Sequence, residues 1–343
     1  MRDYSFIAQV TRFKEYLESS ENIVILSHTN PDGDAVGSLT GMRKFLSLID
    51  KKAVMVLPDE YPEYLSFLDS HKGILIYDNN RSEVDELLKR CDMIIAVDFN
   101  QLSRIDSLEK PVAGSMAKKV LIDHHPDPQE DIFDLVISYI DMSSTSELIY
   151  RLLTAIPEFK SLVDANVAES LYVGMMTDTN NFSNSVTGST FKMASDLLLL
   201  GVDKEALQQK VFGGFSENRM RLMGHALLNK MVIIDKFNVG YITISKEEQE
   251  HFNFVEGDSE GFVNLPLNIN GIFISALFME KDDHIRVSLR SINNFSVNKL
   301  SRIHFNGGGH LRAAGGRLYM DIDEVGSYFE NALEQSFEEC FVL

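Results

Sequence analysis

The chain has 343 residues, enough for two domains with separate hydrophobic cores. Hydrophobic residues make up 44% and charged residues 24% of the sequence, as in soluble globular proteins. No apolar run approaches the roughly 18 residues that span a bilayer, and the N-terminal segment has no signal-like apolar core. Two cysteines, Cys91 and Cys340, give no disulfide framework, so we expect a cytoplasmic protein without a membrane partner.

The net charge of −19 argues against a protein that tracks long duplex nucleic acid, which needs an extended basic surface. Positive charge is nevertheless concentrated in residues 284–317, which contain six Lys and Arg residues and no Asp or Glu. That segment carries +6 and the remainder −25. A chance fluctuation in charge is the simpler explanation, but a compact basic patch on an acidic protein favours a small anionic ligand.

The first half alternates between strand and helix patterns. Phe6, Ile7, Val10, Phe13 and Leu17 fall on one face of an expected N-terminal helix. Strands are expected at 22–28, 51–58, 91–99, 118–125 and 134–141, and helices at 34–50, 82–90 and 143–156. This alternation predicts an α/β fold with a mostly parallel sheet flanked by helices on both faces.

Helices continue at 164–176, 188–200, 203–212 and 216–230, and strands return at 239–245, 271–280 and 284–291. In the helix at 143–156, Ser144 and Glu147 have the spacing of a capping box. We expect a catalytic domain at 1–215, a linker helix at 216–235 and a smaller α/β domain at 236–343.

Acidic and histidine residues follow several of the expected elements. They are His28, Asp32 and Asp34 after the first strand, Asp98, then Asp123, His124 and His125, and Asp178 after a helix. Each group alone is more readily explained by a turn or a helix cap. Because parallel strands end at one edge of a sheet, the groups can converge, and oxygen and imidazole ligands without cysteine favour a pair of Mn²⁺ or Mg²⁺ ions.

The same segments carry a family resemblance. "SHTNPDGDAVGS", "AVDFN", "LIDHHP" and "GMMTDTNNF" resemble the four motifs of the DHH phosphoesterases, and "GGGHLRAAGG" resembles the signature of their DHHA1 domain. Length and motif order are most similar to the short bacterial type of bifunctional oligoribonuclease and pAp phosphatase (NrnA). The larger RecJ-type exonucleases are less similar, and the family II pyrophosphatases lack the glycine-rich second half.

The resemblance implies a role for each site residue. His28, Asp32 and Asp98 would hold one metal ion. Asp34, Asp98, His124 and Asp178 would hold the other, with Asp98 as the bridge. His125 would face the substrate phosphate, Asp123 would orient a histidine, and Gly33 would allow a tight turn between two carboxylates. The expected cofactor is two Mn²⁺ ions, with Mg²⁺ or Co²⁺ as substitutes.

The glycine-rich segment 306–317 is a second candidate site. Glycines let backbone N–H groups approach an anion, and arginines add charge-assisted hydrogen bonds. A tight loop in which the glycines only relieve crowding is the alternative. With Arg290 nearby we favour an anion site, and the DHHA1 resemblance implies that it holds the substrate end remote from the scissile phosphate. The candidate substrate-binding residues are Arg290, Gly308, Gly309, His310, Arg312 and Arg317.

These observations predict a two-metal phosphoesterase with its active site in a cleft between the two domains. The expected substrates are short oligoribonucleotides and 3′-phosphoadenosine 5′-phosphate (pAp). A phosphodiesterase for cyclic or linear dinucleotides is the nearest alternative, and a nucleotide-binding regulator without catalysis is the non-enzymatic one. Whether the chain forms a homodimer is left open by the sequence.

Overall fold

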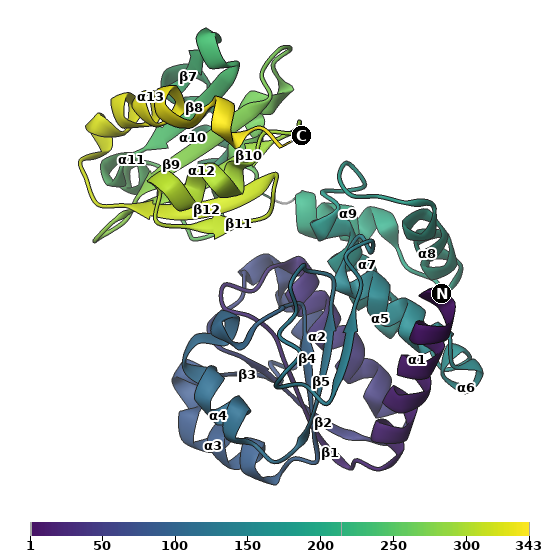
Figure 1. Cartoon of the computed structure of the whole chain (residues 1–343). Coiled ribbons are helices and arrows are strands. Elements are labelled where there is room, and N and C mark those ends of the chain that lie inside the picture. Colours follow the sequence, from purple (N-terminus) through teal and green to yellow (C-terminus); the bar gives the residue numbers. More distant parts are fainter. Residues whose placement is uncertain (1, 214, 343) are drawn as a thin grey trace. The chain divides into compact units, whose positions relative to one another are not determined.

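The computed structural model describes residues 2–213 and 215–342, and the chain divides into two compact units (Figure 1). Unit 1 is Met1–Gly214 and unit 2 is Phe215–Leu343. No helix among the described residues is long and apolar enough to cross a bilayer.

Unit 1 contains a six-stranded sheet in which every neighbouring pair of strands is parallel. The strand order is β3-β2-β1-β4-β5-β6. The strands are β1 (Asn22–Leu26), β2 (Lys52–Leu57), β3 (Ile74–Ile76), β4 (Met93–Val97), β5 (Lys118–Asp123) and β6 (Leu135–Ser138). The predicted mostly parallel α/β fold is confirmed, and the short edge strand β3 is an addition that the sequence pattern did not reveal.

The helices of unit 1 end close to the expected positions. They are α1 (Arg2–Glu18), α2 (Gly33–Leu48), α3 (Tyr77–Arg90), α4 (Glu109–Gly114), α5 (Thr145–Thr154), α6 (Pro157–Lys160), α7 (Ala165–Asp178), α8 (Gly188–Leu199) and α9 (Lys204–Phe212). In α1 the predicted apolar face is incomplete, because Ile7 keeps 60% of its surface exposed while Phe13 and Leu17 are buried.

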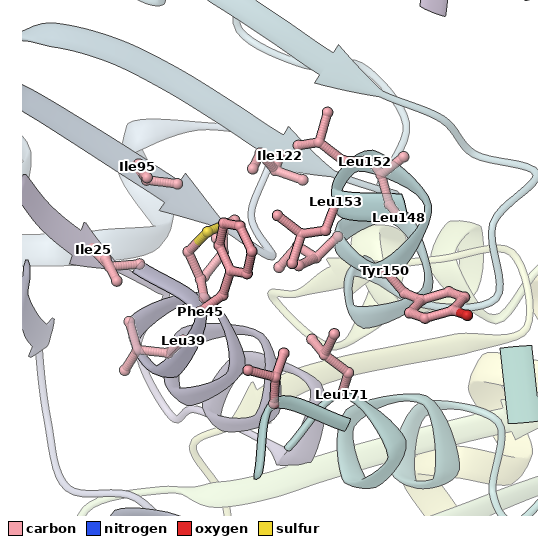
Figure 2. Close-up of a cluster of buried hydrophobic side chains, with 14 of the residues drawn as sticks. Ile25, Leu39, Phe45, Ile95, Ile122, Leu148, Tyr150, Leu152, Leu153 and Leu171 are labelled. Atoms are coloured by element: carbon pink, nitrogen blue, oxygen red, sulfur yellow. The ribbon is translucent and has the colours of Figure 1, made fainter. Parts of the chain in front are cut away.

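Each face of the sheet has its own hydrophobic core. Alternate residues of a strand point to opposite faces, so Ile23 and Ile25 of β1 belong to one core and Val24 and Leu26 to the other. The first core contains α2, α5 and α7, and Figure 2 shows Ile25, Ile95 and Ile122 directed towards these helices. Both faces are therefore covered, and the polar groups that matter for function gather at the strand ends.

Unit 2 contains a mixed six-stranded sheet in the order β11-β12-β10-β9-β8-β7. Its strands are β7 (Met231–Ile234), β8 (Val239–Ile244), β9 (Ile274–Glu280), β10 (Ile285–Ser291), β11 (Gly308–Gly309) and β12 (Ala313–Leu318). Its helices are α10 (Glu217–His225), α11 (Lys246–His251), α12 (Val297–His304) and α13 (Val325–Ser336). The segment predicted as a linker helix, 216–235, forms α10, one π-helical turn and β7, and its Leu222 and Ala226 are buried in a core of unit 2.

Candidate metal centre

The loop after β1 carries the first candidate ligands. Asp32 caps α2, because its Oδ1 accepts hydrogen bonds from the N–H groups of Asp34 at 3.0 Å and Ala35 at 3.1 Å. His28 is buried, and its Nε2 lies 3.5 Å from Oδ2 of Asp98. Asp32 can therefore cap the helix and bind a metal at the same time, because capping uses only Oδ1 and Oδ2 stays available as a ligand.

Glycines at the contact between α2 and α7 bring two carboxylates together. A Cβ on Gly33 would lie 2.3 Å from Oγ1 of Thr177, and one on Gly37 would lie 2.7 Å from the carbonyl oxygen of Ser170. Gly33 is not in the left-handed region, so its expected role in a tight turn is wrong. It instead permits the close approach of α7, which ends at Asp178.

Asp98 occupies the centre of the constellation. It follows β4 with a φ of 65°, an uncommon conformation that asparagine and aspartate tolerate better than most residues. Oγ1 of Thr145 donates a hydrogen bond to Oδ1 of Asp98 at 3.0 Å. Nε2 of His124 lies 3.8 Å and Nδ1 of His125 lies 3.9 Å from the same oxygen. One carboxylate thus lies beside several candidate ligands.

Backbone carbonyls orient two of the histidines. Nδ1 of His28 lies 2.8 Å from the carbonyl oxygen of Thr29, and Nδ1 of His124 lies 3.3 Å from that of Met142. A carbonyl can only accept, so we assign the proton to Nδ1 in both rings. Each Nε2 is then left with a lone pair, as a metal ligand requires.

His125 is held by the buried carboxylate before it. Its Nδ1 lies 2.7 Å from Oδ1 of Asp123, and its backbone N–H donates to Oδ2 of the same residue at 3.1 Å. This arrangement supports the expected role of Asp123, which is to orient a histidine. Nε2 of His124 lies 3.6 Å from Oδ2 of Asp178 on α7.

Three overlapping groups of side chains have ligand atoms within 4.8 Å of one another. They are His28 with Asp32 and Asp98, Asp34 with His124 and Asp178, and Asp98 with His124 and His125. The group of His28, Asp32 and Asp98 is the same as the first predicted set of metal ligands. The group of Asp34, His124 and Asp178 contains three of the four residues predicted for the second metal. The fourth predicted residue, Asp98, lies near His124 in the remaining group. His125, expected to face substrate, also lies within reach of a metal.

Burial and mutual repulsion shift the pKa values of several of these groups. Burial first, and then the neighbouring carboxylates of Asp34 and Asp32, raise the pKa of Asp98 and of Asp178 well above the usual range. Burial lowers the pKa of His28 and so favours the neutral imidazole that binds metal. The donor set of carboxylates and neutral imidazoles fits Mn²⁺ or Mg²⁺.

Some contributing residues were not found from the sequence. Asp34 accepts hydrogen bonds from the N–H groups of Thr145 at 2.6 Å and Ser146 at 3.0 Å, so the start of α5 fixes it in place. The predicted capping box is only half formed. Ser144 accepts from the N–H of Glu147, whereas the carboxylate of Glu147 accepts from Ser143, Ser189 and Thr190.

The glycine-rich segment of unit 2 is a β-ribbon. Gly308 and Gly309 form β11, and β12 begins at Ala313, next to β10. Gly309 has a φ of 148°, and a Cβ there would lie 2.5 Å from the carbonyl oxygen of Ala313. The backbone conformation and this close contact therefore explain why position 309 is a glycine. A Cβ on Gly308 would meet only side-chain atoms, at 3.5 Å or more, so crowding does not explain that glycine.

The arginines of this region differ in their partners. Arg290 on β10 is half-buried, burial lowers the pKa of its guanidinium, and its Nη1 donates to the carbonyl oxygen of Leu289. Arg286, four residues earlier on the same face, is paired with Glu256 at 3.0 Å. His310, Arg312 and Arg317 are exposed. Part of the basic patch is therefore neutralised within unit 2, while Arg290 is held away from water.

The sequence matches two family models. Residues 22–175 match the model described as DHH family, N-terminal domain, and residues 235–339 match the DHHA1 domain. Together with the centre described above, these matches define the class of the protein, a metal-dependent phosphoesterase. The chain belongs to the DHH family, and its second half contains a DHHA1 domain.

Individual relatives span most of the chain. It is 30% identical over 301 residues to the bifunctional oligoribonuclease and PAP phosphatase NrnA of Bacillus subtilis, covering 87% of this chain and 90% of that protein. A solved structure of an exopolyphosphatase-related protein from Bacteroides fragilis has a TM-score of 0.93 and 41% identity, with 96% of each chain covered. The cyclic-di-AMP phosphodiesterase GdpP of B. subtilis is 24% identical over 95% of this chain and 49% of its own length.

Proposed function

We propose that the protein hydrolyses short oligoribonucleotides, of about two to five nucleotides, to nucleoside monophosphates and removes the 3′-phosphate of pAp to give AMP. The observation that carries the proposal is the set of three overlapping ligand groups that share Asp98 or His124. The NrnA relative, which covers most of the chain, supports this choice of substrates. The expected cytoplasmic location stays a prediction.

The site residues would have different roles in the reaction. His28, Asp32 and Asp98 would hold one cation, and Asp34, Asp98, His124 and Asp178 the second. When bound, the cations neutralise phosphate oxygens and activate a water for attack on phosphorus. Asp123 would orient His125 through Nδ1, so that Nε2 of His125 faces the substrate phosphate. The products are the alcohol that leaves and a phosphate monoester, or inorganic phosphate in the case of pAp.

We propose Mn²⁺ as the native ion, with Mg²⁺ or Co²⁺ as substitutes. Unit 2 would bind the substrate away from the scissile phosphate through Arg290, His310 and the backbone at Gly308. The half-buried guanidinium of Arg290 supports this role, because an arginine held away from water gains most from a bound anion.

A panel of substrates with Mn²⁺ tests the proposal. It contains pAp, RNA of about two to five nucleotides, RNA of about 24 nucleotides and cyclic di-AMP, each at physiological salt. We expect kcat/KM to fall steeply from the short RNAs to the long one, because the acidic protein, at −19, repels an extended polyanion. Equal turnover of long and short RNA would contradict the choice of substrate.

The second candidate is a phosphodiesterase for cyclic or linear dinucleotides. The similarity to GdpP favours it, although this chain spans about half the length of that relative. Efficient linearisation of cyclic di-AMP with pAp left intact would select this function over the first.

A further inference from the structure

Arg104 lies beside the candidate metal centre in the 3₁₀ segment η2 (Leu102–Leu108), which follows β4 and Asp98. Leu102, Ile105 and Leu108 are buried, and Asp106, with a φ of 45°, interrupts the helical backbone between the last two. The three apolar residues anchor the segment in the core. Arg104 is not one of them, and its side chain is exposed.

The backbone of Arg104 is bound to the loop that carries His28. The N–H of Thr29 donates to the carbonyl oxygen of Arg104 at 2.9 Å, and Oγ1 of Thr29 donates to the same oxygen at 3.1 Å. The positive charge of Arg104 also contributes, after burial, to lowering the pKa of His28. Arg104 is therefore fixed next to the group formed by His28, Asp32 and Asp98.

The side chain of Arg104 is available for a ligand. Among the described residues, its guanidinium takes part in no ion pair or side-chain hydrogen bond. Unit 1 contains 33 Asp and Glu residues against 20 Lys and Arg residues, so positive charge is the scarcer kind there. Arg104 is also the only lysine or arginine among the leading influences on the pKa values of His28, Asp98 and Asp178.

We propose that Arg104 binds a phosphate oxygen of the substrate at the His28 side of the metal centre. This inference rests on the proposed phosphoesterase function. A guanidinium presents two parallel N–H groups to a phosphate, which gives both charge and orientation. The phosphate has more oxygens than two metal ions and His125 would contact. Arg104 offers a positive charge that is not paired with an acidic side chain among the described residues of unit 1.

The experiment measures phosphate binding separately from turnover. Inorganic phosphate is titrated by calorimetry into the Mn²⁺-loaded full-length protein and into its Arg104→Ala and Arg104→Lys variants. Lys110→Ala is the matched control, because Lys110 is an exposed cation on α4 that contacts neither the loop nor the ligands. Mn²⁺ affinity and melting temperature are measured for every protein, and kcat/KM is measured with pAp.

We expect Arg104→Ala to weaken phosphate binding and kcat/KM about ten- to a hundredfold, while Mn²⁺ affinity and melting temperature stay unchanged. Arg104→Lys should recover part of the loss, because it keeps the charge but not the two parallel donors. Lys110→Ala should behave like the parent protein.

Three results would overturn the assignment. The first is unchanged phosphate affinity in Arg104→Ala, and the second is no measurable phosphate binding by the parent. The third is loss of Mn²⁺ from Arg104→Ala, which would mean that the residue only holds the loop in place. Failure of the substrate proposal looks different, since the parent would then bind phosphate in an Arg104-dependent way without hydrolysing pAp or short RNA.

Discussion

Asp98 belongs to two of the three ligand groups, and asparagine is its closest replacement. Asparagine tolerates the positive φ and keeps an oxygen that can accept from Thr145. We expect Asp98→Asn to lower kcat by about a thousandfold or more and to abolish stabilisation by Mn²⁺. In the presence of a chelator the same variant should melt at a higher temperature than the parent, because it removes a buried negative charge from among other carboxylates.

The pH dependence of the metal-free protein follows from the same pKa shifts. Because the pKa values of Asp98 and Asp178 are raised on folding, the folded state binds protons more tightly than the unfolded chain. Their contribution to stability is therefore lost as pH rises above the ordinary carboxyl pKa of about 4. Melting curves in chelator at acidic and alkaline pH should show a smaller decline for Asp98→Asn than for the parent, and an equal decline would contradict this account.

Asp59 contacts the first ligand loop but belongs to none of the three ligand groups found among the described residues. Both of its carboxylate oxygens lie 2.9 Å from the N–H of Asn30, a residue with a φ of 51° between His28 and Asp32. We expect Asp59→Ala to weaken Mn²⁺ binding about ten- to a hundredfold, as other residues that support metal ligands do. Metal titration by calorimetry measures this, with Glu63→Gln as the exposed control. Unchanged Mn²⁺ affinity would show that the loop holds its shape without Asp59.

At the scale of elements, the close contact between α2 and α7 sets the distance between Asp34 and Asp178. A Cβ on Gly37 would lie 2.7 Å from a carbonyl oxygen and 2.8 Å from the amide nitrogen of Gly174, so the helices must separate to accept it. Gly37→Ala should therefore cost about 1–3 kcal/mol of stability and also weaken Mn²⁺ binding. Gly114→Ala on α4 is the control, because a Cβ there meets no atom within 4 Å.

Thermal unfolding in chelator and metal titration together check this prediction. For a unit of this size, the expected loss for Gly37→Ala corresponds to roughly 2–12 °C in melting temperature. Gly114→Ala should leave both quantities close to the parent values. If Gly37→Ala lowers stability but leaves Mn²⁺ affinity intact, the two carboxylates do not depend on the spacing of the helices.

At the scale of the whole molecule, the two units should contribute separately to activity. Arg290→Ala in unit 2 should lower kcat/KM about ten- to a hundredfold without changing Mn²⁺ affinity, because the ligand groups lie in unit 1. Arg286→Gln is a matched control on the same strand, since Arg286 is already paired with Glu256. Steady-state kinetics, corrected for the fraction of folded protein, test this prediction. An equal loss of kcat/KM in both variants would mean that the overall positive charge of the strand, and not Arg290 in particular, binds the substrate.

Much of this organisation could be predicted from the sequence. The short apolar runs and the periodic helices indicated the α/β fold, because apolar patterning decides which parts of an element are buried. The strand ends indicated that His28, Asp98 and His124 would meet, because parallel strands finish at one edge of a sheet. These features depend on local pattern and on a general rule of topology, and both can be read along the chain.

Other features depend on which distant segments come into contact. Three such contacts join residues at least 29 positions apart. They are the hydrogen bond from Asn30 to Asp59, the hydrogen bond from Thr145 to Asp98, and the ion pair of Arg286 with Glu256. Gly33 looked like a turn residue, yet its role is set by Thr177 on a helix far along the chain. Local spacing indicates which groups can bind metal or phosphate. Only tertiary packing determines which of them are already paired, which are buried, and which, like Arg104, are left available for a ligand.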